Sequence, residues 1–237
     1  MTREQLLARL VADAAARYRR AGLFAFLFAR GKLRGDPIYA ALLARGLIED
    51  RSAVLDLGCG QGLLAAWLEA ASACHGRGAW HEQWKSPPEL RSYHGIELSA
   101  REVTRARAAL GTGATVERAD IRAADYRAAD VVVLLDVLHY IDPPGQERIL
   151  RRVRGALKPA GTLLMRVGDA GAGLGFSVSR LLDRLVRICR GHGTGRLYTR
   201  TLGEWASLLE RAGFASFPTP MSEGTPFANV LIVAIPR

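Results

Sequence analysis

The stretch Ala53–Glu69, AVLDLGCGQGLLAAWLE, joins a short apolar run to a helix-like pattern through three alternating glycines. Glycine turns between a strand and a helix usually hold a ligand, most often a phosphate at the start of the helix. This stretch contains no lysine or arginine, and an acid, Asp56, stands just before the turn. A carboxylate beside a phosphate is unfavourable, so we expect the turn Gly58–Gly62 to hold a cationic ligand.

Two common phosphate-binding motifs do not match this turn. A Walker loop needs a lysine and a serine or threonine after its last glycine, whereas Leu63 and Leu64 follow Gly62. The dinucleotide fingerprint G-x-G-x-x-G needs its third glycine one position later than Gly62. We therefore expect neither a nucleoside triphosphate nor a dinucleotide at this turn.

Beyond residue 50, short apolar segments alternate with helix-like segments. This alternation is typical of a doubly wound α/β fold with a mainly parallel sheet. The run VVVLL at 131–135 is apolar at every position, as in a strand covered on both faces. The expected strands begin at Ala53, Ser92, Thr115, Asp130, Gly161 and Asn229, and the expected helices span Gly62–Ser72, Ala100–Leu110, Pro144–Leu157 and Thr201–Ala212.

The pattern divides the chain into a helical N-terminal segment, residues 1–50, and one α/β domain, residues 51–237. A length of 237 residues with 49% apolar composition suits one sizeable core. Two stretches interrupt the alternation and are predicted to be insertions. One is 74–91, rich in glycine, proline and tryptophan, and the other is 170–198, which carries an amphipathic helix pattern from about Ser177 to Cys189.

Acids stand at the expected carboxyl ends of three further strands, namely Glu97, Asp120 and Asp136. In an open parallel sheet these ends line the ligand crevice, and an acid after the second strand accepts hydrogen bonds from ribose hydroxyls. Together with Asp56, they would surround a nucleoside that carries a positive charge.

The motifs VLDLGCGQG, GIELS, RADI, VVLLDVLHYI and LKPAGTLLM resemble, in this order, those of class I S-adenosylmethionine-dependent methyltransferases. The resemblance covers about 52–167 and implies a Rossmann-like, mainly parallel seven-stranded sheet with a helical cap, and S-adenosyl-L-methionine as cofactor. Glu97 lies 41 positions after Asp56 (97 minus 56), about twice the usual interval, because the insertion intervenes. The resemblance assigns the cofactor pocket to Asp56, Gly58, Cys59, Gly60, Gly62, Glu97, Leu98, Asp120, Ile121, Asp136 and Val137.

His139, which follows the fourth expected strand, is the candidate catalytic base because imidazole titrates near neutral pH. The alternative is a histidine that packs or positions the methyl acceptor without taking its proton. Tyr140 is the second candidate catalytic residue. We expect no metal site, since Cys74, His75 and His81 lack a fourth ligand at zinc spacing.

The net charge of +10 favours acidic partners. The segment 18–35, YRRAGLFAFLFARGKLRG, combines phenylalanines with cations. It suits a plain core helix, contact with an anionic membrane surface, or a lid over the cofactor whose basic rim meets an acidic carrier. The portion 28–43, FARGKLRGDPIYAALL, is also faintly similar to methyltransferases of aryl-polyene-type pigment assembly.

The form DVLHYI resembles small-molecule O- or C-methyltransferases, and this resemblance implies O- or C-methylation of a small, apolar or aromatic acceptor, free or bound to an acyl carrier protein. The runner-up is an RNA or protein methyltransferase that uses the basic surface. Nucleic acid is the less expected partner, since an N-P-P-[YF] motif and an RNA-binding module are missing. A catalytically idle cofactor-binding protein is the third hypothesis, against which the intact acids argue.

The sequence also favours a cytoplasmic location, with peripheral membrane contact through the N-terminal segment. Three cysteines are too few for a disulfide framework, and the start of the chain lacks the order of a signal peptide. The apolar run Ala21–Ala29 has nine residues, and a spanning helix needs about 20.

Overall fold

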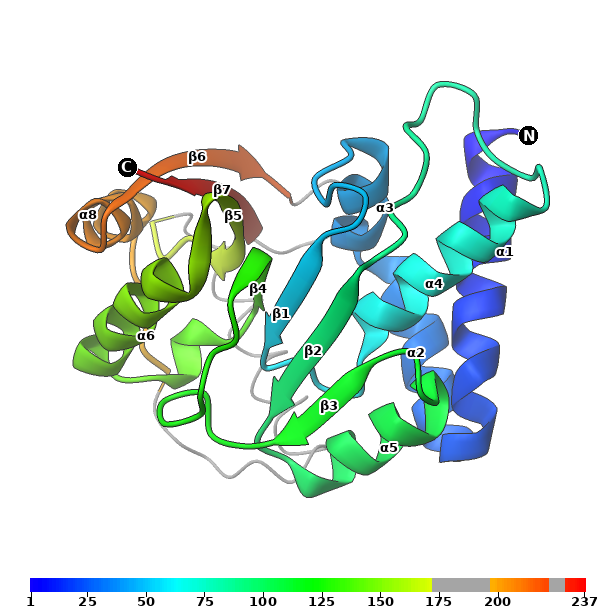
Figure 1. Cartoon of the computed structure of the whole chain (residues 1–237), viewed down its shortest axis with the longest axis horizontal. Helices are drawn as coiled ribbons and strands as arrows, with labels where there is room; N and C mark the ends of the chain where they lie inside the picture. The colour runs from blue at the N-terminus through cyan, green and yellow to red at the C-terminus, as the bar shows by residue number, and fades with distance from the viewer. Residues whose placement is uncertain (172–196, 222–228) are drawn as a thin grey trace. The chain divides into compact units, whose positions relative to one another are not determined.

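The computed structural model describes residues 1–171, 197–221 and 229–237 (Figure 1). The strands form a seven-stranded sheet in the order β3-β2-β1-β4-β5-β7-β6. This mixed, mainly parallel sheet confirms the predicted Rossmann-like methyltransferase fold. The chain forms two compact units, residues 1–131 and 132–237, and their boundary falls within β4 (Ala129–Leu135).

The first unit begins with four helical elements, of which the first and the last start at a side-chain cap. Thr2 and Gln5 form a capping box at the first helix, and the Asp36 carboxylate accepts from the Ile38 N–H at the last. Leu6 and Leu10 are fully buried where the first helix packs against its neighbours. These elements are α1 (Arg3–Ala16), η1 (Arg17–Ala21), α2 (Leu23–Gly35) and α3 (Pro37–Ala44).

Three parallel strands and two helices follow in the first unit. Ala53 lies opposite Ser92, and His94 lies opposite Thr115, in the two parallel pairings. Parallel strands are joined by right-handed crossovers, which bring both connecting helices to the same face of these strands (Figure 1). These elements are β1 (Ala53–Leu57), α4 (Leu63–Gly76), β2 (Ser92–Glu97), α5 (Ala100–Leu110) and β3 (Thr115–Arg118).

The second unit ends in an antiparallel arrangement, in which β7 pairs with both β5 and β6. The sequence pattern did not single out β6, and the structure shows that this strand tolerates Pro218 and Pro220 as the edge strand. Gly213, with φ +88°, follows the helix α8 as expected of a C-terminal glycine. After β4 come η2 (Leu138–Tyr140), α6 (Pro143–Ala156), β5 (Leu157–Gly168), α8 (Leu202–Arg211), β6 (Phe214–Pro220) and β7 (Asn229–Pro236).

The two predicted insertions have different outcomes. Helix α4 continues to Gly76, so Cys74 is a buried helical residue and the irregular segment begins only at Arg77. The helix pattern at 177–189 lies outside the described residues.

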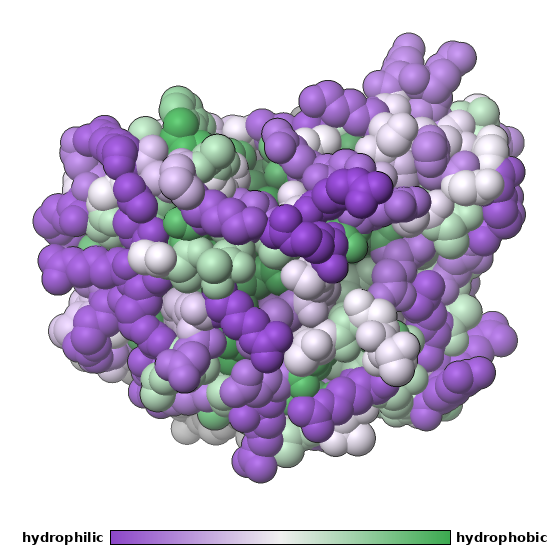
Figure 2. All heavy atoms as spheres, viewed as in Figure 1, coloured by the Kyte–Doolittle hydropathy of each residue, from purple (hydrophilic) through white to green (hydrophobic). Residues whose placement is uncertain are grey.

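Polar residues cover most of the face of the molecule shown in Figure 2, with smaller apolar areas between them. In the part of the chain that the structure describes, no helix has the length and apolar character needed to cross a membrane.

Candidate functional site

The glycine turn after β1 adopts a backbone conformation that strongly favours glycine. Gly58, Gly60 and Gly62 have φ values of +78°, +57° and +77°, a region that other residues rarely enter. A Cβ on Gly62 would also lie 2.6 Å from a methyl carbon of Leu110. The third glycine therefore allows the start of α4 to pack closely on α5.

The turn is open on the side of Gly60. A Cβ built there would meet no atom within 4 Å. The backbone of the turn can therefore be approached closely by a ligand at this point.

Asp56, the penultimate residue of β1, is a buried acid beneath the turn. It exposes 5% of its surface, and its carboxylate accepts a hydrogen bond from the Tyr93 hydroxyl. Burial is the main cause that raises the pKa of Asp56 to about 7; the Tyr93 hydrogen bond opposes the rise, and the nearby charge of Glu97 adds to it. Asp56 is thus an acid whose charge changes near neutral pH.

Glu97 ties the end of β2 to the glycine turn. Its Oε2 accepts from the Gly60 N–H at 3.0 Å, and its Oε1 accepts from the Ser99 N–H at 2.8 Å. The structure therefore brings Glu97 together with the turn despite the long interval in the sequence.

Cys59 lies inside the turn and packs against β2. A Cβ on Gly95 would come within 2.6 Å of the Cys59 sulfur, so this contact depends on glycine in the neighbouring strand. Burial raises the pKa of the Cys59 thiol, and the charges of Asp56 and Glu97 raise it further. A thiol that stays protonated is a poor nucleophile, which leaves Cys59 a packing role.

The predicted residues after β2 and β3 differ in their surroundings. Leu98 exposes 57% of its surface. Asp120 is paired with the Arg122 guanidinium, whose hydrogen bond lowers the pKa of the Asp120 carboxyl. Ile121 is buried, and its carbonyl oxygen accepts from the Tyr126 hydroxyl at 2.5 Å.

The predicted acid of the second unit, Asp136, is already neutralised within that unit. Its carboxylate forms two hydrogen bonds with the buried guanidinium of Arg166. Asp136 also has φ +59°, an uncommon value for a residue with a side chain. Arg166 thus neutralises the charge of Asp136 and stabilises its backbone conformation, directly before Val137.

His139 and Tyr140 lie in the short helix η2, with their ring centres 4.1 Å apart. His139 is buried with 8% exposure, and its carbonyl oxygen accepts from the Tyr198 N–H at 2.8 Å. The side-chain amide of the fully buried Gln146 donates to the carbonyl oxygens of Leu138 and Tyr198. These bonds fix the backbone on both sides of the His139 imidazole.

Three residues that support the glycine turn were not predicted from the sequence. The Tyr18 hydroxyl donates to the Gln61 carbonyl oxygen at 2.9 Å, and the Gln61 side-chain amide donates to the Ala25 carbonyl oxygen at 3.1 Å. Tyr93, which bonds Asp56, is the third. The one local signal in the sequence was a glutamine, Gln61, within the turn. Its partners Tyr18 and Ala25 lie about 40 positions away in the sequence, so the pairings themselves had no local signal.

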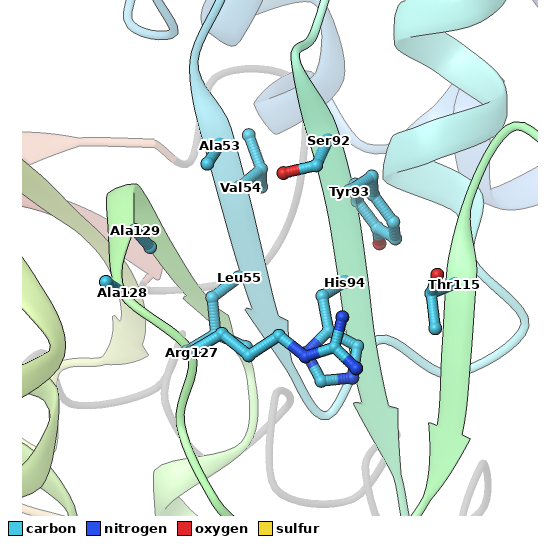
Figure 3. Close-up of a pocket in the computed structure, with 10 residues that line it drawn as sticks. All are labelled: Ala53, Val54, Leu55, Ser92, Tyr93, His94, Thr115, Arg127, Ala128 and Ala129. Atoms are coloured by element: carbon cyan, nitrogen blue, oxygen red, sulfur yellow. The ribbon is translucent and has the colours of Figure 1, made fainter.

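A pocket of about 120 Å³ lies elsewhere in the first unit, and it contains none of the predicted site residues. Figure 3 shows it at the amino ends of the strands, lined by Ala53, Ser92 and Thr115, with Arg127 beside His94. The glycine turn lies at the opposite, carboxyl end of β1. This pocket is therefore separate from the glycine turn.

The described residues contain no cluster of side chains that could bind a metal ion. No three histidine, cysteine, aspartate or glutamate side chains there are grouped closely enough to hold a metal ion.

Residues 14–218 match the methyltransferase-domain family. The carboxy-S-adenosyl-L-methionine synthase of Chromohalobacter salexigens is 31% identical over 143 residues, which cover 56% of this chain and 48% of that protein. The chain thus spans about half the length of this curated relative.

Solved structures share the fold at low sequence identity. A putative methyltransferase in complex with the Trm112 activator of Haloferax volcanii is similar with a TM-score of 0.63 and 17% identity, covering 96% of this chain and 97% of that one. Magnesium protoporphyrin IX methyltransferase from Synechocystis, solved with bound S-adenosylhomocysteine, has a TM-score of 0.58 and 19% identity, covering 98% and 100%. With the family match over most of its length, this chain belongs to the class I S-adenosylmethionine-dependent methyltransferases.

Proposed function

We propose that this protein transfers the methyl group of S-adenosylmethionine to an oxygen or carbon atom of a small, apolar or aromatic acceptor. The observation that carries the proposal is the open glycine turn with two carboxylates, Asp56 and Glu97, and no lysine or arginine in 53–69. S-adenosylmethionine has a sulfonium and an ammonium group. Carboxylates favour such cations over the phosphates of a dinucleotide.

The residues at the turn fit the separate parts of this cofactor. Each Glu97 oxygen accepts one backbone N–H, and a carboxylate oxygen has a further lone pair that can accept from a ribose hydroxyl. The backbone at Gly60 faces open space, which suits the methionine portion. Ile121 offers an apolar side chain to adenine. When bound, the cofactor supplies an electrophilic methyl group.

The remaining task of the protein is to align the acceptor, exclude water and remove a proton where the acceptor carries one. Asp56, Glu97 and the glycine turn would hold the cofactor, which would supply its methyl group to an electron pair of the acceptor oxygen or carbon, with the electrons of the carbon–sulfur bond left on sulfur. We assign proton removal to His139, whose backbone is fixed by Tyr198 and Gln146. We assign Tyr140, which packs on its ring, to the wall of the acceptor site.

The character of the acceptor is inferred from α2. The Gln61–Ala25 hydrogen bond attaches this helix to the glycine turn, and the helix carries Phe24, Phe26 and Phe28. Aromatic side chains beside the cofactor turn favour an apolar or aromatic acceptor. An acyl carrier protein that delivers the acceptor would be acidic, and the net charge of +10 would favour its approach.

Transfer of labelled methyl groups from S-adenosylmethionine into cell extract tests the proposal. We expect the label in small molecules that partition into organic solvent, and loss of labelling in the Glu97→Gln variant. Glu82→Gln is the matched control, because Glu82 is an exposed acid in the irregular segment after α4. Label confined to RNA or protein would contradict the proposed acceptor class, and no label in any fraction would contradict methyl transfer.

A further inference from the structure

Helix α2 presents an exposed stripe of two leucines followed by two arginines. Leu23, Leu27, Arg30 and Arg34 are spaced at four, three and four positions, so they lie along one side of the helix, and all four are exposed. We call these four residues the α2 stripe. We propose that the α2 stripe docks on an anionic lipid membrane.

The apolar part of the stripe protrudes from the protein. Leu23 exposes 72% of its surface and Leu27 53%, and the neighbouring Phe24 exposes 47%. Large apolar side chains with this exposure on adjacent positions are costly in water. A bilayer interface accepts protruding apolar side chains without requiring a matching pocket for each of them.

The charge around the stripe has one sign. Residues 17–35 contain six lysines and arginines and no acid. Arg17 pairs with Glu69, and Lys32 pairs with Asp36. Within the described ranges, Arg30 and Arg34 form no ion pair with an acid, and neither does Arg20 just before the helix. Guanidinium groups beside protruding leucines suit anionic headgroups, since the arginine stem can lie along the apolar region of the bilayer while its charge stays in the headgroup layer.

The stripe is held rigid by the opposite side of the same helix. Ala25, Ala29 and Leu33 are buried against the protein, and the Ala25 carbonyl oxygen accepts from Gln61. The Arg105 guanidinium lies 4.8 Å from the centre of the Phe24 ring, which adds a further contact with α5. The docking surface is therefore formed before binding and has little ordering cost.

An acidic protein is the competing occupant. It would be attracted by the same arginines, but binding would then depend mainly on Arg30 and Arg34 and little on the protruding leucines. A membrane needs both, because the headgroups attract the cations and the acyl region takes up the leucines. The dependence on Leu23 and Leu27 therefore separates the two partners.

Co-sedimentation of the full chain with vesicles tests the inference. We expect binding to phosphatidylcholine vesicles that contain phosphatidylglycerol, weaker binding to phosphatidylcholine alone, and a decrease as salt is raised. The double variant Leu23→Ser/Leu27→Ser should reduce partitioning by about tenfold or more. Arg30→Gln/Arg34→Gln should remove the preference for phosphatidylglycerol.

The matched control is Phe217→Ser, which removes a side chain with 56% exposure on β6 and should leave vesicle binding unchanged. Thermal unfolding shows whether each variant is folded. If Leu23→Ser/Leu27→Ser does not fold, the single variant Leu27→Ser is used in its place. Absence of vesicle binding, or binding that survives the leucine changes, would overturn the inference, as would capture by an acidic acyl carrier protein without vesicle binding. Because no cofactor is added, these results are independent of the proposed methyl transfer.

Discussion

Replacement of Asp56 by asparagine should change the stability and the cofactor affinity in opposite directions. In the folded protein the pKa of Asp56 rises from 3.8 to about 7, chiefly because the carboxyl is buried. A raised pKa means that the folded state binds the proton more tightly than the unfolded state does. The ionised carboxylate therefore destabilises the fold, and this cost grows as the pH rises from about 4 to about 7.

The size of the cost follows from the rise in pKa. The pKa of Asp56 rises by about three pKa units, and each unit corresponds to about 1.4 kcal/mol. Above pH 7 the ionised carboxylate therefore lowers the free energy of unfolding by at most about 4 kcal/mol. Asparagine carries no charge and can still accept the hydrogen bond from the Tyr93 hydroxyl. We expect Asp56→Asn to be more stable than the natural protein by about 1 to 3 kcal/mol near pH 8, and no more stable near pH 4.

The affinity for S-adenosylmethionine should increase as the pH rises, whereas the stability of the fold decreases. A cation at the turn favours the ionised carboxylate, so the affinity should increase with pH and level off above about 7. Below that value, the affinity should fall by up to about tenfold for each pH unit.

Denaturant unfolding and calorimetric titration near pH 6 and pH 8 provide both measurements, with about tenfold weaker binding expected at the lower pH. In Asp56→Asn the affinity should be lower at pH 8 and independent of pH. A variant that is less stable than the natural protein at pH 8, or a natural protein whose affinity is the same at both pH values, would refute the reasoning.

Three further predictions concern the turn, the second unit and the base. Gly62→Ala should lower the stability by about 1 to 3 kcal/mol in thermal unfolding. The control Gly31→Ala, where a Cβ meets no atom within 4 Å, should raise the stability by about 0.5 to 1 kcal/mol. Equal effects of the two substitutions would contradict the role of the turn. Arg166→Met should cost about 3 to 5 kcal/mol, because it removes the guanidinium that neutralises the Asp136 carboxylate. The double variant Arg166→Met/Asp136→Asn should recover much of this loss in denaturant unfolding, and no recovery would contradict the pairing. His139→Ala should lower turnover far more than cofactor affinity in steady-state kinetics and calorimetry, and equal losses in both would count against a base.

The glycine turn and the position of Glu97 could be predicted because both follow from local rules. An apolar strand, a glycine turn and a helix lie within Ala53–Glu69, and parallel strands bring their carboxyl ends to one edge. The hydrogen bond between Glu97 and Gly60 is the direct consequence. The length of the segment between them had no effect on this outcome.

The surroundings of the other acids could not be predicted in the same way. Arg166 lies 30 positions after Asp136, and Tyr93 lies 37 positions after Asp56, so each pairing depends on the finished fold. The pairing of Asp120 with Arg122 is local, but an exposed ion pair has no distinctive sequence pattern. The sequence therefore indicated where acids stand and left open which of them are neutralised.

The missed strand has a different physical reason. Proline lacks the N–H that a strand donates, so Pro218 and Pro220 make 214–220 unlike an ordinary strand in its sequence. At the edge of the sheet one side of a strand needs no partner, and there prolines are tolerated. Edge position depends on the strand order, which a single sequence does not give.

Calorimetric titration of the purified protein with S-adenosylhomocysteine, the demethylated product, and with a nicotinamide dinucleotide tests the central claim most directly. The carboxylates at the glycine turn predict saturable binding of S-adenosylhomocysteine that is weakened by Glu97→Gln and unaffected by Glu82→Gln. They predict no binding of the dinucleotide, whose phosphates would face Asp56. Binding of the dinucleotide without binding of S-adenosylhomocysteine would contradict the account.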